Sequence, residues 1–401
     1  MTTLTTRTDQ SPWDVFWIFL RLGLTSFGGP VAHLGYFREE FVSRRQWLSD
    51  RSYADLVALC QFLPGPASSQ VGIALGFSRA GYSGALAAWT GFTLPSAIVL
   101  IVFAMGITSA GSSFSEGALQ GLKIVAVAVV TQAVWGMARS LCTDAKRITI
   151  MMLATCAVLL MPSVWSQIGV IIVAGLAGVM LFKPAQLAPN DPLPIQITRR
   201  TGAFWLTLFF IILIVLPVAA EALPNQTLAI IDAFYRAGSL VFGGGHVVLP
   251  LLQTEVVPTG WVDEQVFLAG YGATQAMPGP LFTFAAFLGA SMSSAPSDWL
   301  GGMIALIAIF IPSFLLVVGA LPFWEQLRQN LRTQAALGGI NASVVGLLLA
   351  ALYQPVWTSA ILSPQDFGLA LVAFVALMFW KLPPWLVVAA GGLAGWLLHL
   401  L

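Results

Sequence analysis

The sequence FLRLGLTSFGGP, which runs from Phe19 to Pro30, returns later in the chain as FYRAGSLVFGGG, from Phe234 to Gly245. A second motif, QFLPGP from Gln61 to Pro66, returns as QAMPGP from Gln275 to Pro280. The two motifs keep their order and nearly keep their spacing, so the chain consists of two related halves. What repeats is a Gly-rich break and a Pro-Gly break within apolar sequence, and neither is compatible with a regular helix interior.

The composition of the chain is that of a membrane protein. Of its 401 residues, 58% are hydrophobic and only 9% are charged, and the mean hydropathy is +0.85. A soluble domain carries about a quarter charged residues. The apolar runs are spread over the whole chain, too many for a single anchor. We therefore expect an all-α polytopic membrane protein.

Other classes of function find no support in the sequence. The net charge is +1 and there is no basic tract, so no nucleic-acid partner is expected. Cys60, Cys142 and Cys156 lack metal-ligand spacing, so no metal site is expected. No hydrolase, ATPase or metalloprotease motif is visible, which predicts neither an enzyme nor a cofactor. Residues 1–12 are polar and show no secretory signal peptide.

The repeat divides the chain into a first repeat, residues 1–182, a linker, residues 183–226, and a second repeat, residues 227–401. The linker contains one further apolar segment, Ala203–Ala220, which we expect to be an extra transmembrane helix. Several apolar pieces beside the breaks are shorter than the ~20 residues that span a bilayer. Broken or re-entrant helices are therefore expected in each repeat. Each broken segment either crosses the membrane or folds back, and the arginines from Arg38 to Arg51 favour folding back.

The distribution of Lys and Arg predicts that the two repeats have inverted topology. These residues gather in cytoplasmic loops. The loop after the first Gly-rich break carries four arginines, whereas its counterpart, Gln253 to Gln265, has neither Lys nor Arg. Three further pairs of equivalent loops also carry basic residues in only one member. We therefore expect a protein of the cytoplasmic membrane with its N-terminus inside and its C-terminus outside.

The repeated breaks predict an anion site within the membrane. A helix that restarts in the membrane exposes unpaired N–H groups with partial positive charge. Gly allows close approach of the backbone, and Pro suits the first helical turn. A packing kink is the alternative for any one break, but four breaks in matched pairs favour function. In transporters, matched breaks of two repeats meet near the bilayer midplane. We therefore expect Gly65 and Gly279 to line one central cavity.

The residues that we expect to contact the anion at these breaks are Ser26, Gly28, Gly29, Gln61, Pro64, Gly65, Ser68, Ser69, Gly243, Gly244, Gln275, Pro278, Gly279 and Thr283.

Two arginines and a lysine are further candidates for anion contact. Arg21 and Arg236 occupy equivalent places inside apolar helices, and ionisable groups at such places usually face a cavity or a partner. Snorkelling toward the headgroups and pairing with a carboxylate are the alternatives. No acid is evidently repeated near both arginines, which favours anion contact. Lys123 is a weaker candidate for the same cavity.

His33 and His246 follow the two Gly-rich breaks and are candidates for proton coupling, because histidine titrates near neutral pH. Ordinary polar packing is the alternative for each. Because no ATPase motif is present, an ion gradient or the membrane potential would have to drive transport.

At these motifs the chain resembles the chromate ion transporter family, in its long form with two fused homologous domains. The first-domain signatures are similar to RLGLTSFGGP at Arg21–Pro30, REEFVSRRQWLSD at Arg38–Asp50 and QFLPGPASSQVGIALG at Gln61–Gly76. The second-domain signatures are similar to FGGGHVVLPLL at Phe242–Leu252 and QAMPGPLFTFAAFLGA at Gln275–Ala290. The resemblance implies chromate efflux driven by the proton motive force, and chromate resistance. The residues by themselves indicate only a small oxyanion.

Two other functions remain open from the sequence. A sulfate-type oxyanion importer would need the same anion site, because chromate and sulfate share shape and charge. A membrane-bound chromate-reducing enzyme would need a flavin, haem or paired-thiol site, which the sequence does not show. The expected partners are chromate or a related oxyanion, protons and the lipid bilayer, and the sequence leaves open whether the protein is a homodimer.

Overall fold

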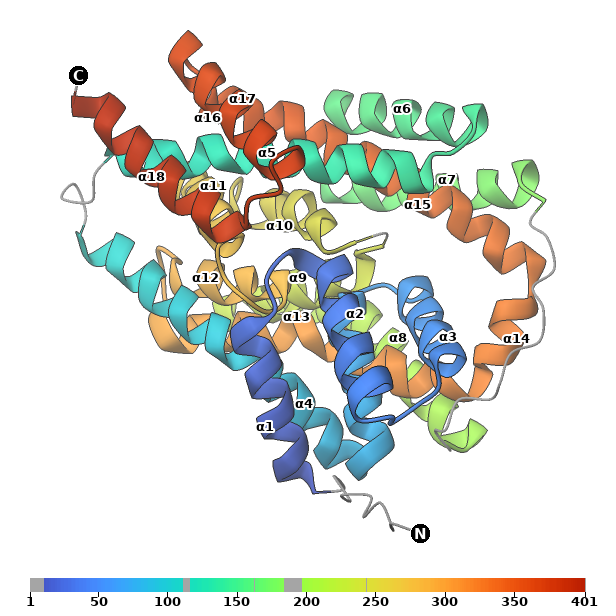
Figure 1. Ribbon diagram of the computed structural model, residues 1–401. Helices are drawn as coiled ribbons and strands as arrows, with labels where there is room; N and C mark the ends of the chain where they lie inside the picture. The colour runs from blue at the N-terminus through green and yellow to red at the C-terminus, as the bar shows by residue number, and fades with distance from the viewer. Residues whose placement is uncertain (1–10, 111–115, 162, 184–196, 243, 401) are drawn as a thin grey trace.

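The fold was analysed in a computed structural model, which describes residues 11–110, 116–161, 163–183, 197–242 and 244–400. Within these residues the regular structure is helical, and no strand is present (Figure 1). The expected all-α polytopic membrane fold is thus confirmed. Five helical segments are long and apolar enough to cross a membrane, namely Ala67–Thr108, Glu116–Leu141, Arg199–Ala222, Asp298–Gln329 and Leu331–Ala360.

The first half and the linker contain α1 (Pro12–Thr25), α2 (Gly29–Arg38), the π-helical turn η1 (Glu39–Arg44), α3 (Asp50–Phe62), α4 (Ala67–Ala110), α5 (Glu116–Leu141), α6 (Ala145–Leu160), α7 (Val164–Leu181) and α8 (Arg199–Ala222). The backbone of α4 is not helical at Ala80 and Gly81, so α4 consists of two helices joined at a kink.

The second half contains α9 (Gln226–Leu240), η3 (Gly245–Val247), α10 (Val248–Val256), α11 (Glu264–Thr274), η4 (Leu281–Thr283), α12 (Phe284–Ala290), α13 (Asp298–Ala320), η5 (Leu321–Phe323), α14 (Trp324–Gln329), α15 (Leu331–Ala351), η6 (Leu352–Trp357), α16 (Thr358–Ala360), α17 (Pro364–Met378) and α18 (Pro384–Leu400). Here α12 and α13 correspond to the two parts of α4.

The linker helix α8 presents an almost wholly apolar surface to its surroundings. Only 6% of its most apolar stretch is buried inside the protein, although that stretch has a hydropathy of 2.6. It packs mainly against α9, α13 and η5, and Trp205 donates to the hydroxyl of Tyr82 in α4. A helix of this composition is stable with such exposure only against lipid, which agrees with the expected extra transmembrane helix.

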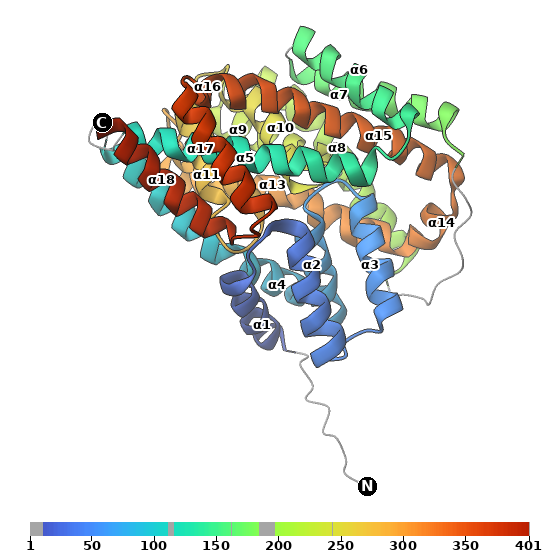
Figure 2. The same cartoon turned by 45° about the horizontal axis from the view of Figure 1, so that its top comes forward.

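Both Gly-rich breaks reverse the direction of the chain. In the first half, the ring of Phe19 in α1 lies 5.6 Å from that of Phe37 in α2 and 5.1 Å from that of Phe41 in η1. In the second half, Arg236 in α9 forms a salt bridge with Glu255 in α10. Residues on the two sides of each break therefore meet, as Figures 1 and 2 also show for α1 and α2. The chain therefore folds back at both Gly-rich breaks, as the arginines from Arg38 to Arg51 predicted.

The Pro-Gly break of the second half also folds back. A Cβ atom at Gly270 in α11 would overlap the ring of Phe287 in α12, so these two helices touch beyond the break. The rings of Tyr271 and Phe284 lie 5.5 Å apart at the same interface. The second half thus contains a further compact hairpin, around Gly279.

The two halves are interlocked through their last helices. The long helix α5 of the first half packs against α17 and α18 of the second, and α15 of the second half packs against α6 and α7 of the first. Equivalent glycines make both contacts close: a Cβ at Gly121 would overlap the carbonyl oxygen of Gly391, and a Cβ at Gly339 would overlap that of Ala174. Small residues of this kind let helices approach closely in membranes.

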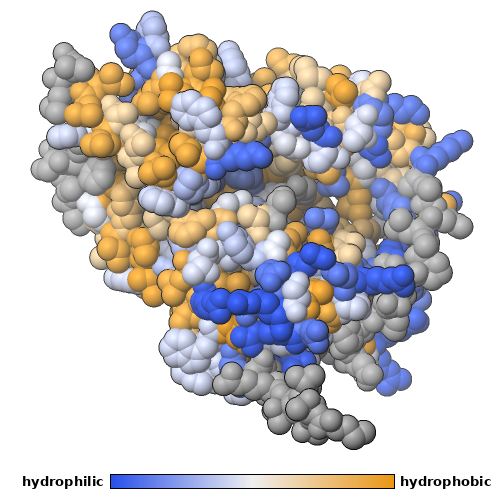
Figure 3. All heavy atoms as spheres, viewed as in Figure 1, coloured by the Kyte–Doolittle hydropathy of each residue, from blue (hydrophilic) through white to orange (hydrophobic). Residues whose placement is uncertain are grey.

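A hydrophilic surface covers the ends of α2 and α3 that lie away from the breaks (Figure 3). Arg38 donates to Asp50 at 2.8 Å there, and Glu40 pairs with Arg44 and Arg45. This is the loop that the positive-inside rule assigns to the cytoplasm. The side of the membrane on which it lies remains a prediction.

Candidate anion site

The breaks of the two halves are joined to each other by a reciprocal pair of backbone hydrogen bonds. The N–H of Gly65 donates to the carbonyl oxygen of Val241 at 2.7 Å, and the N–H of Gly279 donates to that of Ser26 at 2.9 Å. Val241 and Ser26 are equivalent positions just before the Gly-rich breaks. Each Pro-Gly break is therefore attached to the Gly-rich break of the other half, which is the arrangement that a twofold relation between the halves produces.

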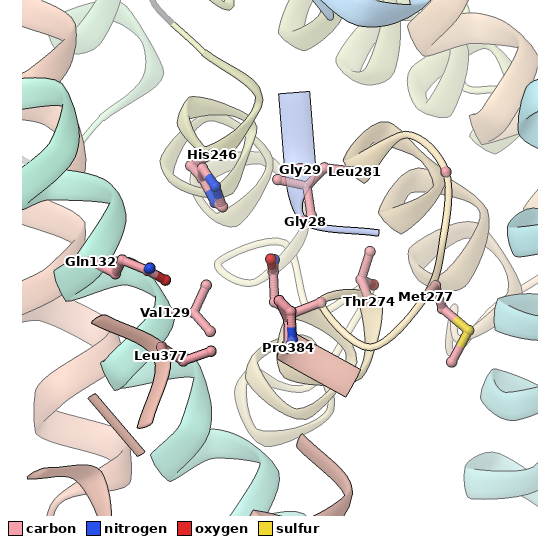
Figure 4. A pocket seen from close by; sticks show the side chains of 12 residues that line it. Gly28, Gly29, Val129, Gln132, His246, Thr274, Met277, Leu281, Leu377 and Pro384 are labelled. Atoms are coloured by element: carbon pink, nitrogen blue, oxygen red, sulfur yellow. The ribbon is translucent and has the colours of Figure 1, made fainter. Parts of the chain in front are cut away.

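A cavity of ≈ 70 Å³ opens where the Gly-rich break of the first half meets the Pro-Gly break of the second (Figure 4). A cavity of about 10–15 Å³ already holds one water, so a small ion fits. The lining residues are Gly28, Gly29, Val129, Gln132, His246, Thr274, Gln275, Met277, Gly279, Leu281, Leu377 and Pro384. They come from both halves, and none of them carries a carboxylate.

Three helical segments start at this cavity without a side-chain cap. Helix α2 begins at Gly29, and its cap residue Gly28 makes no side-chain hydrogen bond. The turns η3 and η4 begin beside His246 and Leu281, and their cap residues also provide no side-chain acceptor.

Several other helices do have such a cap, as expected for helix starts in proteins. The capping side chains are those of Ser11, Ser49, Asp144, Ser163, Thr198, Asn225, Asp263, Asn330 and Ser363. Uncapped starts at a cavity leave their N–H groups to a ligand.

The glycines at the breaks have backbone conformations that other residues rarely adopt. The φ angles are 100° at Gly28, 77° at Gly29 and 95° at Gly279. A Cβ at Gly29 would have no protein atom within 4 Å, so it would point into open space. The missing side chain therefore leaves room at the start of α2.

Two polar side chains of the lining bear directly on anion binding. The Nε2 donor of Gln275 is buried without a hydrogen-bond partner among the described residues. His246 reaches the cavity while its Nδ1 lies 2.8 Å from the hydroxyl of Tyr271. A cavity with a free donor, three helix starts and no acid in its lining is suited to an anion.

His33, the other histidine candidate, is not part of the cavity lining. It is buried, and its Nε2 donates to the carbonyl oxygen of Ser26 at 3.2 Å. Its Nδ1 lies 3.4 Å from the hydroxyl of Ser68. His33 therefore joins the two breaks of the first half, which is the polar packing that the sequence left open as an alternative.

The Pro-Gly break of the first half lies apart from the cavity lining. Gly279 lines the cavity together with Gly28 and Gly29, whereas Gly65 does not. Gln70 fills the space at Gly65 because its Nε2 donates to the carbonyl oxygen of Pro64 at 2.6 Å. The cavity shared by the two Pro-Gly breaks, as the sequence led us to expect, is thus replaced by one between unlike breaks.

Arg21 and Arg236 differ in their surroundings although they are equivalent. Arg21 is exposed, whereas Arg236 is largely buried between Asp232, at 2.6 Å, and Glu255, at 3.3 Å. Neither lines the cavity. The expectation that no acid is repeated near both arginines is wrong, because Glu255 pairs with Arg236 and the charge of Arg21 acts on Glu40, which lies at the same spacing in the first half.

Lys123 is also outside the cavity lining. Its Nζ lies 3.4 Å from the carbonyl oxygen of Ser359, and the hydroxyl of Ser359 donates to Glu264. The charges of Asp366, Asp263 and Glu264 act on it. Lys123 therefore belongs to an acid-rich cluster near the start of α5, whereas the cavity is lined by residues further along that helix.

The remaining candidates lie around the breaks but not in the lining. Ser68 bonds to His33, and Thr283 donates to the carbonyl oxygen of Pro280. Gln61 is exposed. The others in this group are Ser26, Pro64, Ser69, Gly244 and Pro278, and Gly243 lies outside the described residues.

The lining residues that sequence reasoning missed come mainly from other helices. Val129 and Gln132 lie on α5, and Leu377 and Pro384 lie at the junction of α17 and α18. Gln132 is a polar residue in an apolar helix, and this is a signal that could have identified it.

The fold and the cavity together define a polytopic helical transporter, and the chain belongs to the chromate transporter family. The family model matches residues 13–179 and again residues 228–396. A chromate transport protein of Pseudomonas aeruginosa is 28% identical over 96% of this chain and 92% of its own. A probable chromate transport protein of Synechococcus elongatus is 26% identical over 94% and 93%. No solved structure matches the chain.

A chromate transport protein of Cupriavidus metallidurans is likewise 27% identical, over 94% of this chain and 90% of its own. The family and these relatives are named for transport, as expected for a protein that is not an enzyme.

Proposed function

We propose that this protein exports chromate, a small divalent oxyanion, across the cytoplasmic membrane, that the proton motive force drives the export, and that the export confers chromate resistance. The observation that carries the proposal is the cavity between Gly28, Gly29 and Gly279, which has uncapped helix starts and no carboxylate in its lining. Membership of the chromate transporter family supports the choice of oxyanion.

The energetics require several contacts to act together. One helix start contributes ~0.3–1 kcal/mol toward an anion, and rarely ~2. Removing an ion from water costs several kcal/mol even after the protein relaxes. Three helix starts and the free donor of Gln275 offset much of this cost. Binding therefore depends on both halves being in place at the same time.

The proposal predicts different effects for two equivalent glutamines. Gln275→Leu removes the free donor from the cavity, and we expect chromate transport to fall by about tenfold, as for the loss of one hydrogen bond to a charged group, ~1.5 kcal/mol or more. Gln61→Leu changes the matched residue of the first half, which is exposed and outside the lining, and should leave transport near the wild-type rate.

The measurement is uptake of labelled chromate into everted membrane vesicles, with and without a proton gradient. Equal loss in both glutamine variants would show that the cavity between the unlike breaks is not the binding site. Excess unlabelled sulfate tests the importer alternative: full competition by sulfate, together with uptake by right-side-out cells, would overturn chromate export.

A further inference from the structure

A buried cluster of two acids and one base joins the helices on either side of the second Gly-rich break. Arg236 in α9 donates to Asp232 of the same helix at 2.6 Å and reaches Glu255 of α10 at 3.3 Å through both terminal nitrogens. The side chains of all three are at most 14% exposed. With both acids ionised the cluster has a net charge of −1.

Charges from neighbouring helices do not balance this excess. The charges that act on Asp232 and Glu255 come from the cluster itself. The elements packed against α9 and α10 are α7, α8, α13, α15 and η3. Their charged residues are exposed and lie at helix ends, and they are Arg199, Arg200, Glu221, Asp298 and Arg332. His246 in η3 is occupied by Tyr271.

An uncompensated carboxylate is costly in such a place. Intramembrane ionisable groups are paired or take part in ion and proton pathways. One carboxylate of the cluster is matched by Arg236, and the second is neutralised when it binds a proton. Asp232 holds Arg236 at the shorter distance. The ion pair between Arg236 and Glu255 is therefore the one that breaks more easily.

The acid of the first half that corresponds to Glu255 has, in contrast, more than one basic partner. Counted from the Gly-rich breaks, Glu40 corresponds to Glu255, and the π-helical turn η1 takes up the one extra residue that the first half has before Trp47. Glu40 pairs with Arg44 and Arg45, and the charge of Arg21 also acts on it. Glu40 therefore stays ionised, and only the second half has an excess of acid.

The cluster connects two helices that carry contacts of the cavity, so a change in its protonation affects the cavity. Arg236 and Glu255 connect α9, which ends just before the Gly-rich break, to α10, which follows it through η3. His246 in η3 lines the cavity, and Val241 after α9 accepts the hydrogen bond of Gly65. Releasing one ion pair between α9 and α10 loosens the hairpin that carries these contacts.

We propose that Glu255 is the proton-carrying group of this transporter, with Arg236 and Asp232 as its partners. Glu255 takes one proton from water on one side of the membrane and releases its bridge to Arg236, which stays with Asp232. It returns the proton to water on the other side, and the bridge forms again. The inference rests on the proposed proton-driven transport and assigns its coupling to Glu255 instead of His33 or His246.

The test separates proton coupling from anion movement in proteoliposomes. Exchange of labelled for unlabelled chromate needs no net proton movement, whereas accumulation against a gradient does. We expect Glu255→Gln to keep exchange within about twofold of wild type and to lose accumulation driven by an imposed pH gradient. Glu255→Asp should keep both, with an altered pH profile. Glu40→Gln is the matched control, with Glu221→Gln as an exposed one, and both should retain accumulation.

Three results would overturn the inference. Normal gradient-driven accumulation by Glu255→Gln would show that another group carries the proton. Equal loss of exchange and accumulation in both Glu255 variants, at normal protein abundance, would show a purely structural ion pair. A wild-type protein that exchanges chromate but ignores the pH gradient would refute the proposed function itself, and this inference with it.

Discussion

Arg236 lies between two carboxylates, whereas its repeat mate Arg21 is exposed. The two arginines occupy the same place relative to a Gly-rich break, yet their surroundings differ because Asp232 has no acidic counterpart: the equivalent residue is Trp17. Twofold repetition of the backbone therefore does not repeat the chemistry. Each half contributes a different part of the site.

Replacing the two arginines by alanine should have unequal effects on stability. Arg236→Ala leaves two largely buried carboxylates without their base, and breaking such a pair costs about 3–5 kcal/mol. Arg21→Ala removes an exposed side chain and should change stability by no more than about 0.5 kcal/mol. Thermal unfolding of the purified proteins in detergent measures both. Equal stability of the two variants would show that Arg236 is not held by its carboxylates.

The sequence predicted the breaks but not how they pair. Gly28, Gly29, Gln275 and Gly279 line the cavity, as does His246, the candidate for proton coupling, and their contact with an anion stays a prediction. The connection of Gly-rich to Pro-Gly breaks across the halves is a tertiary contact, and no local pattern encodes it. Gln132 and the α17–α18 junction were missed for the same reason, because helices far along the chain bring them to the cavity.

At the scale of elements, the helix pairs α5–α18 and α7–α15 are matched contacts built on glycine. In each, a glycine of one helix meets the backbone of the other, so that any side chain would separate them. In lipid there is no hydrophobic force between helices, and close packing of this kind supplies the attraction instead. The packing of α5 against α18 and of α7 against α15 therefore depends on small residues.

Two glycines of α7 provide a matched test of this dependence. A Cβ at Gly178 would overlap the carbonyl oxygen of Ala335 in α15, and Gly178→Ala should destabilise the protein by about 1–3 kcal/mol. A Cβ at Gly169 meets no atom within 4 Å, so Gly169→Ala should be neutral or stabilise by about 0.4–1 kcal/mol. Unfolding temperatures of both variants decide the matter. A neutral Gly178→Ala would mean that α7 and α15 are not in close contact.

The extent of the helices was predicted well where apolar runs are long and less well at the breaks. Helix α8 was expected at Ala203–Ala220 and extends over Arg199–Ala222. The two helices of α4 meet at Ala80 and Gly81, where the backbone is not helical. The π-helical turn at Glu39–Arg44 was not foreseen, although the first half has one more residue than the second between the Gly-rich break and Trp47.

At the scale of the whole molecule, the halves are connected by exchanged helices, by reciprocal hydrogen bonds at the breaks and by a buried polar contact. In that contact Trp324 donates to Asp55 at 2.9 Å, and Arg328 lies 3.7 Å from the same carboxylate. The residue equivalent to Asp55 is Ala269, so the second half has no acid at this position. The link between Asp55 and α14 is therefore not repeated at Ala269, and this contact joins the two halves asymmetrically.

The direction of the twofold relation is the remaining large-scale prediction. The bonds from Gly65 to Val241 and from Gly279 to Ser26 fit a twofold axis, but an axis along the membrane normal and one in the membrane plane both allow them. The distribution of Lys and Arg favours the axis in the membrane plane. In that case equivalent loops lie on opposite faces, and the loop that contains Ser43 is cytoplasmic while the loop that contains Thr259 is external.

Cysteine labelling distinguishes the two axes, because Ser43 and Thr259 are both exposed. Single variants Ser43→Cys and Thr259→Cys are made in a protein whose native cysteines, of which Cys156 is exposed, have been replaced. A membrane-impermeant maleimide should label the Thr259→Cys variant in intact cells and the Ser43→Cys variant only after the cells are opened. Labelling of both variants in intact cells, or of neither, would place the axis along the membrane normal and exclude inverted repeats.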